Sequence, residues 1–89
     1  MIAKKVKLSK VGDRYYILPQ DGINKMFAMN SSCKNVWDFL QEDLTIDELI
    51  VKMAKHYDIN SNSIASDIKE VVQSFIDNEL IDFTNENHL

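Results

Sequence analysis

The sequence has few of the residues that build covalent, metal or redox sites. Its one cysteine, Cys33, excludes an internal disulfide and a cysteine-based zinc site. It has two histidines, two glycines and one proline, and it contains no P-loop, dinucleotide fingerprint or metal-ligand cluster. No apolar run approaches the length of a transmembrane helix, and no apolar segment of a signal peptide follows the first lysines. We therefore expect a cytoplasmic protein without cofactor or metal.

The chain is short enough to limit what it can build. With 89 residues it allows one domain, which we place at residues 1–84, followed by a disordered tail at 85–89. A chain of this size buries about 60–65% of its unfolded surface, which leaves no room for a second lobe or a deep catalytic cleft.

Charge is unevenly spread along the chain. Residues 1–25 hold six basic and two acidic residues, a net of +4, whereas residues 26–89 hold four basic and twelve acidic residues, a net of −8. The formal net charge of −4 makes the chain a poor default candidate for binding nucleic acid or anionic lipid, because both depend on excess positive charge.

The first thirty residues predict strands. Residues 5–8 alternate polar and apolar side chains, and residues 14–18 are rich in aromatic and β-branched residues. Residues 19–22, Pro-Gln-Asp-Gly, form a turn signal. Residues 23–29 alternate again, which predicts that Ile23, Phe27 and Met29 share one face and Asn24, Met26 and Ala28 share the other.

The rest of the chain predicts three amphipathic helices. The first begins near residues 30–32, which favour N-caps. The second begins with a capping box formed by Thr45 and Glu48. The third follows the cap-forming cluster at residues 60–63 and runs from Ser63 to Glu79. The predicted class is α+β and winged helix-turn-helix-like, with a two- or three-stranded N-terminal antiparallel sheet followed by three helices.

The residue pattern does not favour an enzyme. His56 lies late in the second predicted helix, where a cation complements the helix dipole, and His88 lies next to the C-terminus. Cys33 falls on an apolar helix face, which favours a buried structural thiol over a nucleophile. Paired carboxylates at residues 47–48 and at 67 and 70 are explained by capping and solvated faces. We expect a protein that is not an enzyme.

Two binding functions remain. In a winged-helix DNA-binding or regulatory domain, the third helix would face phosphates, yet it carries four acidic residues against Lys69. A peptide-binding domain fits better, because a small sheet beside an amphipathic helix offers an unpaired strand edge and an apolar groove. A third possibility is that the domain only scaffolds an enzyme complex.

Several segments, taken in order, resemble PqqD-like proteins. Residues 29–40 (MNSSCKNVWDFL) are similar to the family stretch LN-x-[ST]-A-x-x-I-W-x-L-L. Residues 44–50 resemble the T-v-x-E-I start of its second helix, and residues 56–59 its x-Y-D-V exit. Residues 64–68 and 75–81 resemble its third helix, so the likeness spans roughly residues 12–82. Two departures concern turn geometry: Glu79 stands where a glycine is common, and Glu42-Asp43 replaces Asp-Gly.

The resemblance implies a recognition element for ribosomally made, modified peptides. Such domains bind the leader segment of a precursor peptide as an added strand, in a cleft against the third helix. By position, the strand is Lys25, Met26, Phe27 and Ala28, and the helix wall is Ile64, Asp67, Ile68, Val71, Val72 and Phe75. Apolar contacts are expected from Met26, Ala28, Ile68, Val71 and Phe75, with Lys25 and Asp67 at the polar rim.

The resemblance also implies two partners, a precursor leader peptide and a peptide-modifying enzyme. We expect the domain to bind neither nucleic acid nor a membrane. The enzyme is a leader peptidase, a cyclase or a radical SAM enzyme. A stand-alone domain of this kind fits lasso-peptide, radical SAM peptide and pyrroloquinoline quinone pathways, and the sequence does not choose among the three.

Overall fold

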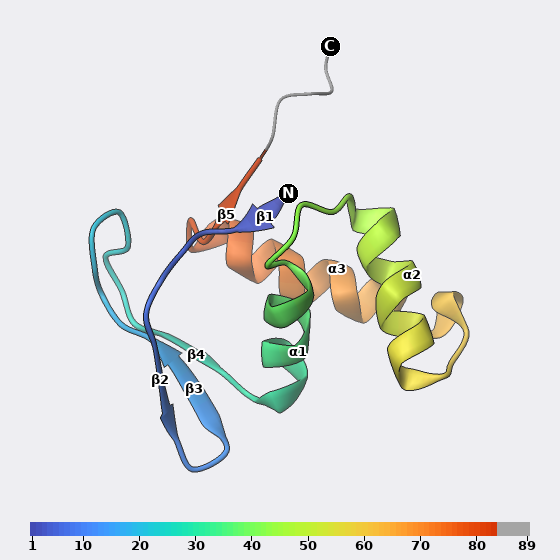
Figure 1. Ribbon diagram of the computed structural model, residues 1–89, viewed down its shortest axis with the longest axis horizontal. Helices are drawn as coiled ribbons and strands as arrows, with labels where there is room; N and C mark the ends of the chain where they lie inside the picture. The colour runs from blue at the N-terminus through green and yellow to red at the C-terminus, as the bar shows by residue number, and fades with distance from the viewer. Residues whose placement is uncertain (84–89) are drawn as a thin grey trace.

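A small sheet lies beside three helices in the computed structural model, which describes residues 1–83 (Figure 1). The chain forms β1 (Ile2–Ala3), β2 (Leu8–Val11), β3 (Arg14–Ile17), β4 (Phe27–Met29), α1 (Ser31–Phe39), α2 (Ile46–Tyr57), α3 (Ser61–Asp77) and β5 (Ile81–Asp82). This confirms the α+β class with an N-terminal antiparallel sheet followed by three helices. The predicted tail at 85–89 lies outside the described residues.

Strands β2, β3 and β4 form one antiparallel sheet in that order. Val11 pairs with Arg14 across a turn at Gly12 and Asp13, and Gly12 has a φ of 63°, a conformation that favours glycine. The strand expected at residues 5–8 was placed too early, because this turn sets the register and β2 runs from Leu8 to Val11.

The connection between β3 and β4 contains the predicted turn. The main-chain N–H and C=O of Gln20 and Ile23 bond to each other at 3.0 and 2.8 Å, and Gly22 has a φ of 81°. The strand after the turn begins at Phe27 rather than at Ile23. The predicted faces are nevertheless confirmed: Ile23 and Met29 are buried and Phe27 half-buried, whereas Asn24, Met26 and Ala28 are exposed.

A second, two-stranded sheet joins the ends of the domain. Ile2 of β1 pairs with Asp82 of β5, and Ala3 pairs with Ile81 (Figure 1). The Ala3 N–H donates to the Leu40 carbonyl at 2.8 Å. The sequence did not predict this sheet, because strands of two residues are too short to show alternation.

Local capping explains where the helices begin. The Asn30 side chain accepts from the Cys33 N–H at 2.8 Å, and Asn60 caps α3 by accepting from the Asn62 N–H at 2.8 Å. The predicted capping box of α2 is present, with Thr45 and Glu48 each accepting from the other's main-chain N–H. Helix α3 runs from Ser61 to Asp77, so it begins and ends two residues before the predicted bounds of Ser63 and Glu79.

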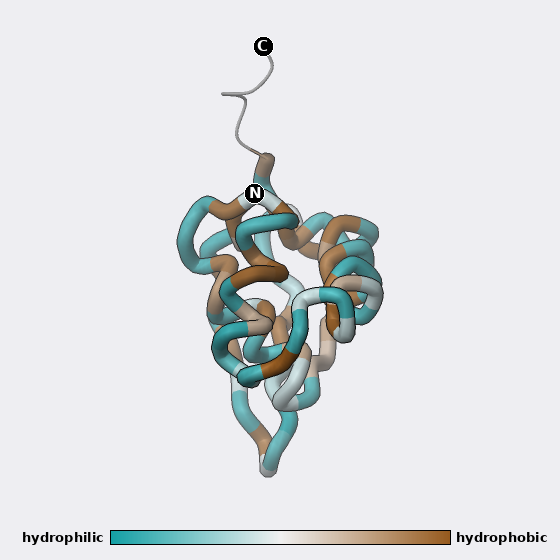
Figure 2. Tube along the Cα trace, turned by 90° about the vertical axis from the view of Figure 1, so that its right-hand side faces the viewer, coloured by the Kyte–Doolittle hydropathy of each residue, from teal (hydrophilic) through white to brown (hydrophobic). Residues whose placement is uncertain are grey.

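The core lies where the inner face of the larger sheet meets the three helices. Hydrophobic and hydrophilic segments alternate along the helices in Figure 2, as amphipathic helices require. The largest fully buried side chains are Phe75, Ile17, Met29, Leu40, Leu49, Met53, Leu80 and Val36. Within residues 1–83, no helix combines the length and the hydropathy that spanning a bilayer requires.

Candidate peptide-binding edge and groove

Strand β4 is an edge strand of the three-stranded sheet. One side of it pairs with β3, through Ile17 with Phe27 and Tyr15 with Met29. Within residues 1–83, no strand pairs with the other side of β4. Apart from the hydrogen bonds between paired strands, residues 24–28 make no main-chain hydrogen bond to the rest of this described part. Because alternate residues of a strand point their N–H and C=O groups to each side, this edge offers free donors and acceptors.

The register of the sheet assigns each side chain of β4 to a face. Phe27 lies in the row of Leu8 and Ile17, which faces the helices. Ala28 lies in the row of Ser9 and Tyr16, on the outer face. Met26 directly precedes β4 and is exposed like Ala28, so the alternation extends the outer face to Met26, whereas Lys25 lies in the bend before it.

Helix α3 approaches the inner side of this edge through one aromatic contact. The ring centroids of Phe27 and Phe75 are 5.6 Å apart, and the Phe75 ring also meets Trp37 edge-on at 5.2 Å. Val71, four residues before Phe75, is half-buried, and Asp67, four residues before Val71, is exposed. Positions four apart share a helix face, so Asp67 and Val71 lie on the same face of α3 as Phe75, which is the residue of this face that contacts β4.

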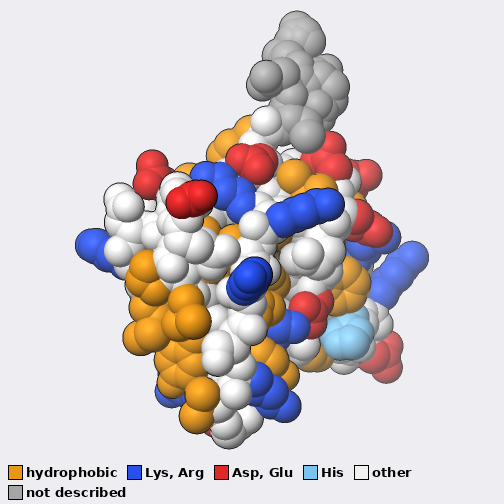
Figure 3. Space-filling view, turned by 60° about the vertical axis from the view of Figure 1, so that its left-hand side comes forward, with side chains coloured by type: hydrophobic (Ala, Val, Ile, Leu, Met, Phe, Trp, Pro, Cys, Tyr) orange, Lys and Arg blue, Asp and Glu red, His pale blue; other side chains and the backbone are white. Residues whose placement is uncertain are grey.

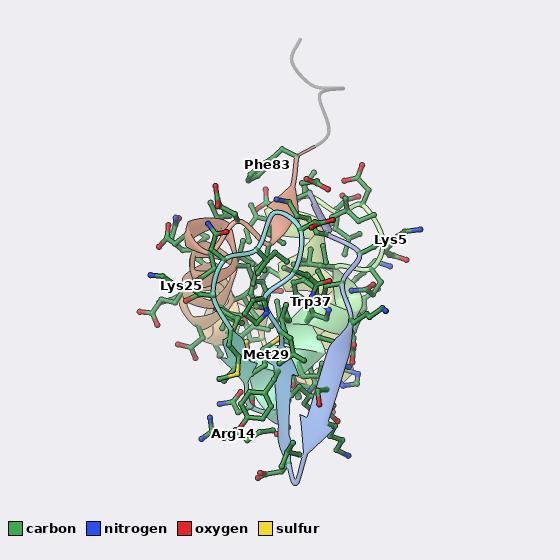
Figure 4. The ribbon with its side chains drawn as sticks, turned by 90° about the vertical axis from the view of Figure 1, so that its left-hand side faces the viewer. Lys5, Arg14, Lys25, Met29, Trp37 and Phe83 are labelled. Carbon is green, nitrogen blue, oxygen red and sulfur yellow. The ribbon has the colours of Figure 1, made fainter. Side chains whose placement is uncertain are left out.

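A polar hollow of about 220 Å³ marks one end of the space between strand and helix. It is lined by Asn24, Lys25, Asp77, Asn78 and Glu79. Figure 4 shows Lys25 on the α3 side of the sheet, away from Lys5, with Trp37 in the interior between them. We use the name edge groove for residues 24–28, which lead into β4 and form its first part, together with the α3 face that carries Asp67, Val71 and Phe75.

The structure joins two of the expected site residues, Phe27 and Phe75, through their rings, and it places the others at different depths. Lys25, Met26, Ala28 and Asp67 are exposed, and Phe27, Ile64 and Val71 are half-buried. Ile68 is buried and Phe75 is 0% exposed, so both lie beneath the groove. Val72 faces away from it, because it lines a separate hollow with Ile46 and Ile76.

Four of the five residues that line the polar hollow were not predicted as site residues. Asn24 falls in the predicted strand, and Asp77, Asn78 and Glu79 fall in the third predicted helix, so only the packing of the end of α3 beside the residues before β4 brings them together. The one signal for this position was Glu79, which stands where the resembling family commonly has glycine.

The residues considered for catalysis lie apart from the edge groove. The exposed His56 packs against the Phe39 ring at 5.5 Å and the Tyr57 ring at 5.0 Å. Burial raises the pKa of the Cys33 thiol to about 11, which keeps it protonated and unreactive near neutral pH. Among residues 1–83, His, Cys, Asp and Glu side chains form no group of three or more that could hold a metal ion.

The fold and the edge groove define a small α+β domain whose edge strand β4, unpaired on one side by any strand of residues 1–83, contacts the third helix. The family described as Coenzyme PQQ synthesis protein D (PqqD) matches residues 14–81, so the chain belongs to the PqqD family. No curated protein and no solved structure shows a significant match to the chain. Family membership makes it an accessory protein of the biosynthesis of PQQ or of another ribosomally made, modified peptide.

Proposed function

We propose that this domain captures the leader segment of a ribosomally made precursor peptide and delivers it to a peptide-modifying enzyme, without catalysing a reaction itself. The observation that carries the proposal is the open main-chain edge of β4 beside α3. Both partners act where ribosomal peptides are made, which corresponds to a cytoplasmic location. Membership in the PqqD family supports the same assignment.

Strand addition explains how so small a domain binds an extended peptide. The main chain of the leader pairs with the free donors and acceptors of β4, which supplies affinity for many sequences. Side chains of the leader that turn inward lie between Phe27 and the α3 side that carries Val71, which supplies selectivity. Lys25 before the strand and Asp67 on the helix are exposed at the rim, where they orient the peptide.

Main-chain pairing can be tested without altering the protein. The probes are synthetic peptides that cover the N-terminal half of each short open reading frame encoded beside this chain. We expect one of them to bind saturably, as measured by fluorescence anisotropy. Methylating its amide nitrogens one at a time should weaken binding about three- to tenfold at alternate positions, since every second amide pairs with β4.

The groove wall is tested by a pair of substitutions. Val71→Asp places a charge beside Phe75 and should abolish most of the affinity, whereas Val51→Asp on α2 serves as the matched control. Circular dichroism must show that both variants are folded. Equal binding by the two folded variants, or methylation losses without a two-residue period, would place the peptide elsewhere.

A further inference from the structure

The outer face of the sheet beside the β4 edge is apolar. Met26 is 57% exposed and Leu18 is 45% exposed, and the exposed Ala28 is paired with Tyr16 on the same face. Figure 3 shows hydrophobic side chains gathered at the lower left of the molecule, over the sheet. A contiguous exposed apolar surface of this kind on a small protein marks a place where another molecule binds.

A strand added to β4 would have apolar neighbours on both of its faces. Its inward side chains lie beside Phe27 and the α3 wall, and its outward side chains lie beside Met26 and Ala28. A strand whose outward neighbours are polar alternates apolar and polar residues, whereas apolar cross-strand neighbours on both faces favour apolar residues at consecutive positions. The residues that would flank it, Met26 directly before β4 and Phe27 and Ala28 within it, are themselves three consecutive apolar residues.

The polar hollow limits this apolar stretch at one end. Lys25 lies there with the carboxylates of Asp77 and Glu79 and the amide of Asn78, and within residues 1–83 no ion pair joins Lys25 to either carboxylate. A side chain that reaches this hollow meets charged and amide groups, so a polar residue fits there and an apolar one does not.

We propose that the recognised segment of the leader is a run of three or more consecutive apolar residues with a polar residue directly beside it, rather than an alternating sequence. This inference rests on the proposed function, and it specifies the class of peptide that the same groove takes. The apolar run lies along Met26, Phe27 and Ala28, and the polar residue lies at the Lys25 end.

A second copy of this chain is a poorer occupant of the same surface. Residues 1–25, which supply two of the three strands, carry six basic and two acidic residues, a net of +4. Two such sheets brought face to face would repel each other, whereas an apolar peptide segment brings no opposing charge.

The test replaces each residue of the binding leader peptide by serine, one at a time, in the peptide identified by anisotropy. We expect losses of about fivefold or more at three consecutive positions, because side chains on both faces lose apolar contact. Losses confined to alternate positions would overturn the inference and leave strand addition intact. If no leader peptide binds the wild-type protein, the proposed function itself fails, and this inference fails with it.

A matched pair of protein variants tests the outer face directly. Met26→Ser and Val11→Ser each replace an exposed apolar side chain on that face, and Val11 lies on β2, at the opposite edge of the sheet. Met26→Ser should weaken leader binding about fivefold, and Val11→Ser should change it less than about twofold. Equal effects of the two variants would overturn the inference, as would a dimer in sedimentation that excess leader peptide leaves intact.

Discussion

The Phe27 and Phe75 rings meet at 5.6 Å with a tilt of 59°, and this contact joins the edge strand of the sheet to α3. Phe75 in turn meets Trp37 of α1 at 5.2 Å, nearly at right angles. These tilted and edge-to-face geometries are the ones that aromatic pairs prefer. The floor of the edge groove is therefore continuous with the hydrophobic core, and the same side chain supports the fold and the proposed site.

Truncation of Phe75 should be among the most destabilising changes in this chain. Phe75 is 0% exposed, and Phe75→Ala removes a ring that packs against both Phe27 and Trp37. We expect the free energy of unfolding to fall by about 3–5 kcal/mol, as for other buried phenylalanines. Urea denaturation followed by circular dichroism measures the change.

The control for this prediction is Phe83→Ala. Phe83 directly follows β5 and is 60% exposed, so its removal should lower the free energy of unfolding by less than about 1 kcal/mol. If the two phenylalanine variants lose similar stability, Phe75 does not carry the packing that the structure assigns to it.

The capping box of α2 gives a second prediction. The Thr45 hydroxyl accepts from the Glu48 N–H at 3.1 Å, so Thr45→Ala leaves that donor without its partner. The free energy of unfolding should fall by about 1 kcal/mol. Ser32→Ala is the matched control, because Ser32 lies in the first turn of α1 while Asn30 is the N-cap, and it should change stability by less than about 0.5 kcal/mol. Thermal unfolding of the two variants measures the difference, and equal midpoint temperatures would contradict the prediction.

The helices could be predicted because their signals are local. Each begins at a capping residue, Asn30, Thr45 or Asn60, and each carries an apolar stripe at helical spacing. The alternation after the Pro-Gln-Asp-Gly turn also predicted that Met26 and Ala28 face outward. Such patterns predict whether a segment forms a helix or a strand, because they depend on the residues of that segment alone.

What the sequence could not predict depends on pairing at a distance. The two-residue strands β1 and β5 are joined across almost the whole chain, and no local pattern marks either. The apolar residues of α3 form one stripe in the sequence, yet Phe75 and Ile68 are buried, Val71 is half-buried, and Val72 faces another hollow. Only the packing of α3 against its neighbours separates core residues from groove residues.

The charge of α3 predicts that the domain does not bind duplex DNA, although its fold is winged helix-turn-helix-like. Asp67, Glu70, Asp77 and Glu79 are all exposed on or directly after this helix, against the single cation of Lys69. A recognition helix of this charge repels phosphates instead of releasing counterions. We expect no change in anisotropy with labelled genomic fragments at physiological salt. A salt-dependent rise would favour a regulatory DNA-binding domain instead.

Burial of Cys33 predicts a loss of stability at alkaline pH. Desolvation raises the pKa of the folded thiol from 9.0 to about 11, so the folded state binds more protons than the unfolded state between these values. The contribution of this thiol to stability is therefore complete below about pH 9 and is lost as the pH rises toward 11. Urea unfolding across this range should show a steeper decline for the wild type than for Cys33→Ala, and equal declines would contradict the assignment.

Glu79 adopts a backbone conformation that suits glycine better than glutamate. Its φ of 60° lies in the left-handed region, directly after α3. The Glu79 N–H donates to the Ile76 carbonyl at 3.0 Å and the Leu80 N–H donates to the Phe75 carbonyl at 2.9 Å, so this conformation closes the helix end. A residue with a Cβ is disfavoured there by about 1–2 kcal/mol, whereas glycine is not.

We therefore expect Glu79→Gly to raise the free energy of unfolding by about 0.5–1 kcal/mol, since relief of this strain exceeds the extra entropy that glycine gives the unfolded chain. Asp58→Gly is the matched control: Asp58 ends α2 with a φ of 55°, but aspartate tolerates the left-handed region better than glutamate. Its gain should be smaller, as measured by urea denaturation. A loss of stability in Glu79→Gly would mean that the glutamate side chain makes a contact that outweighs its backbone strain.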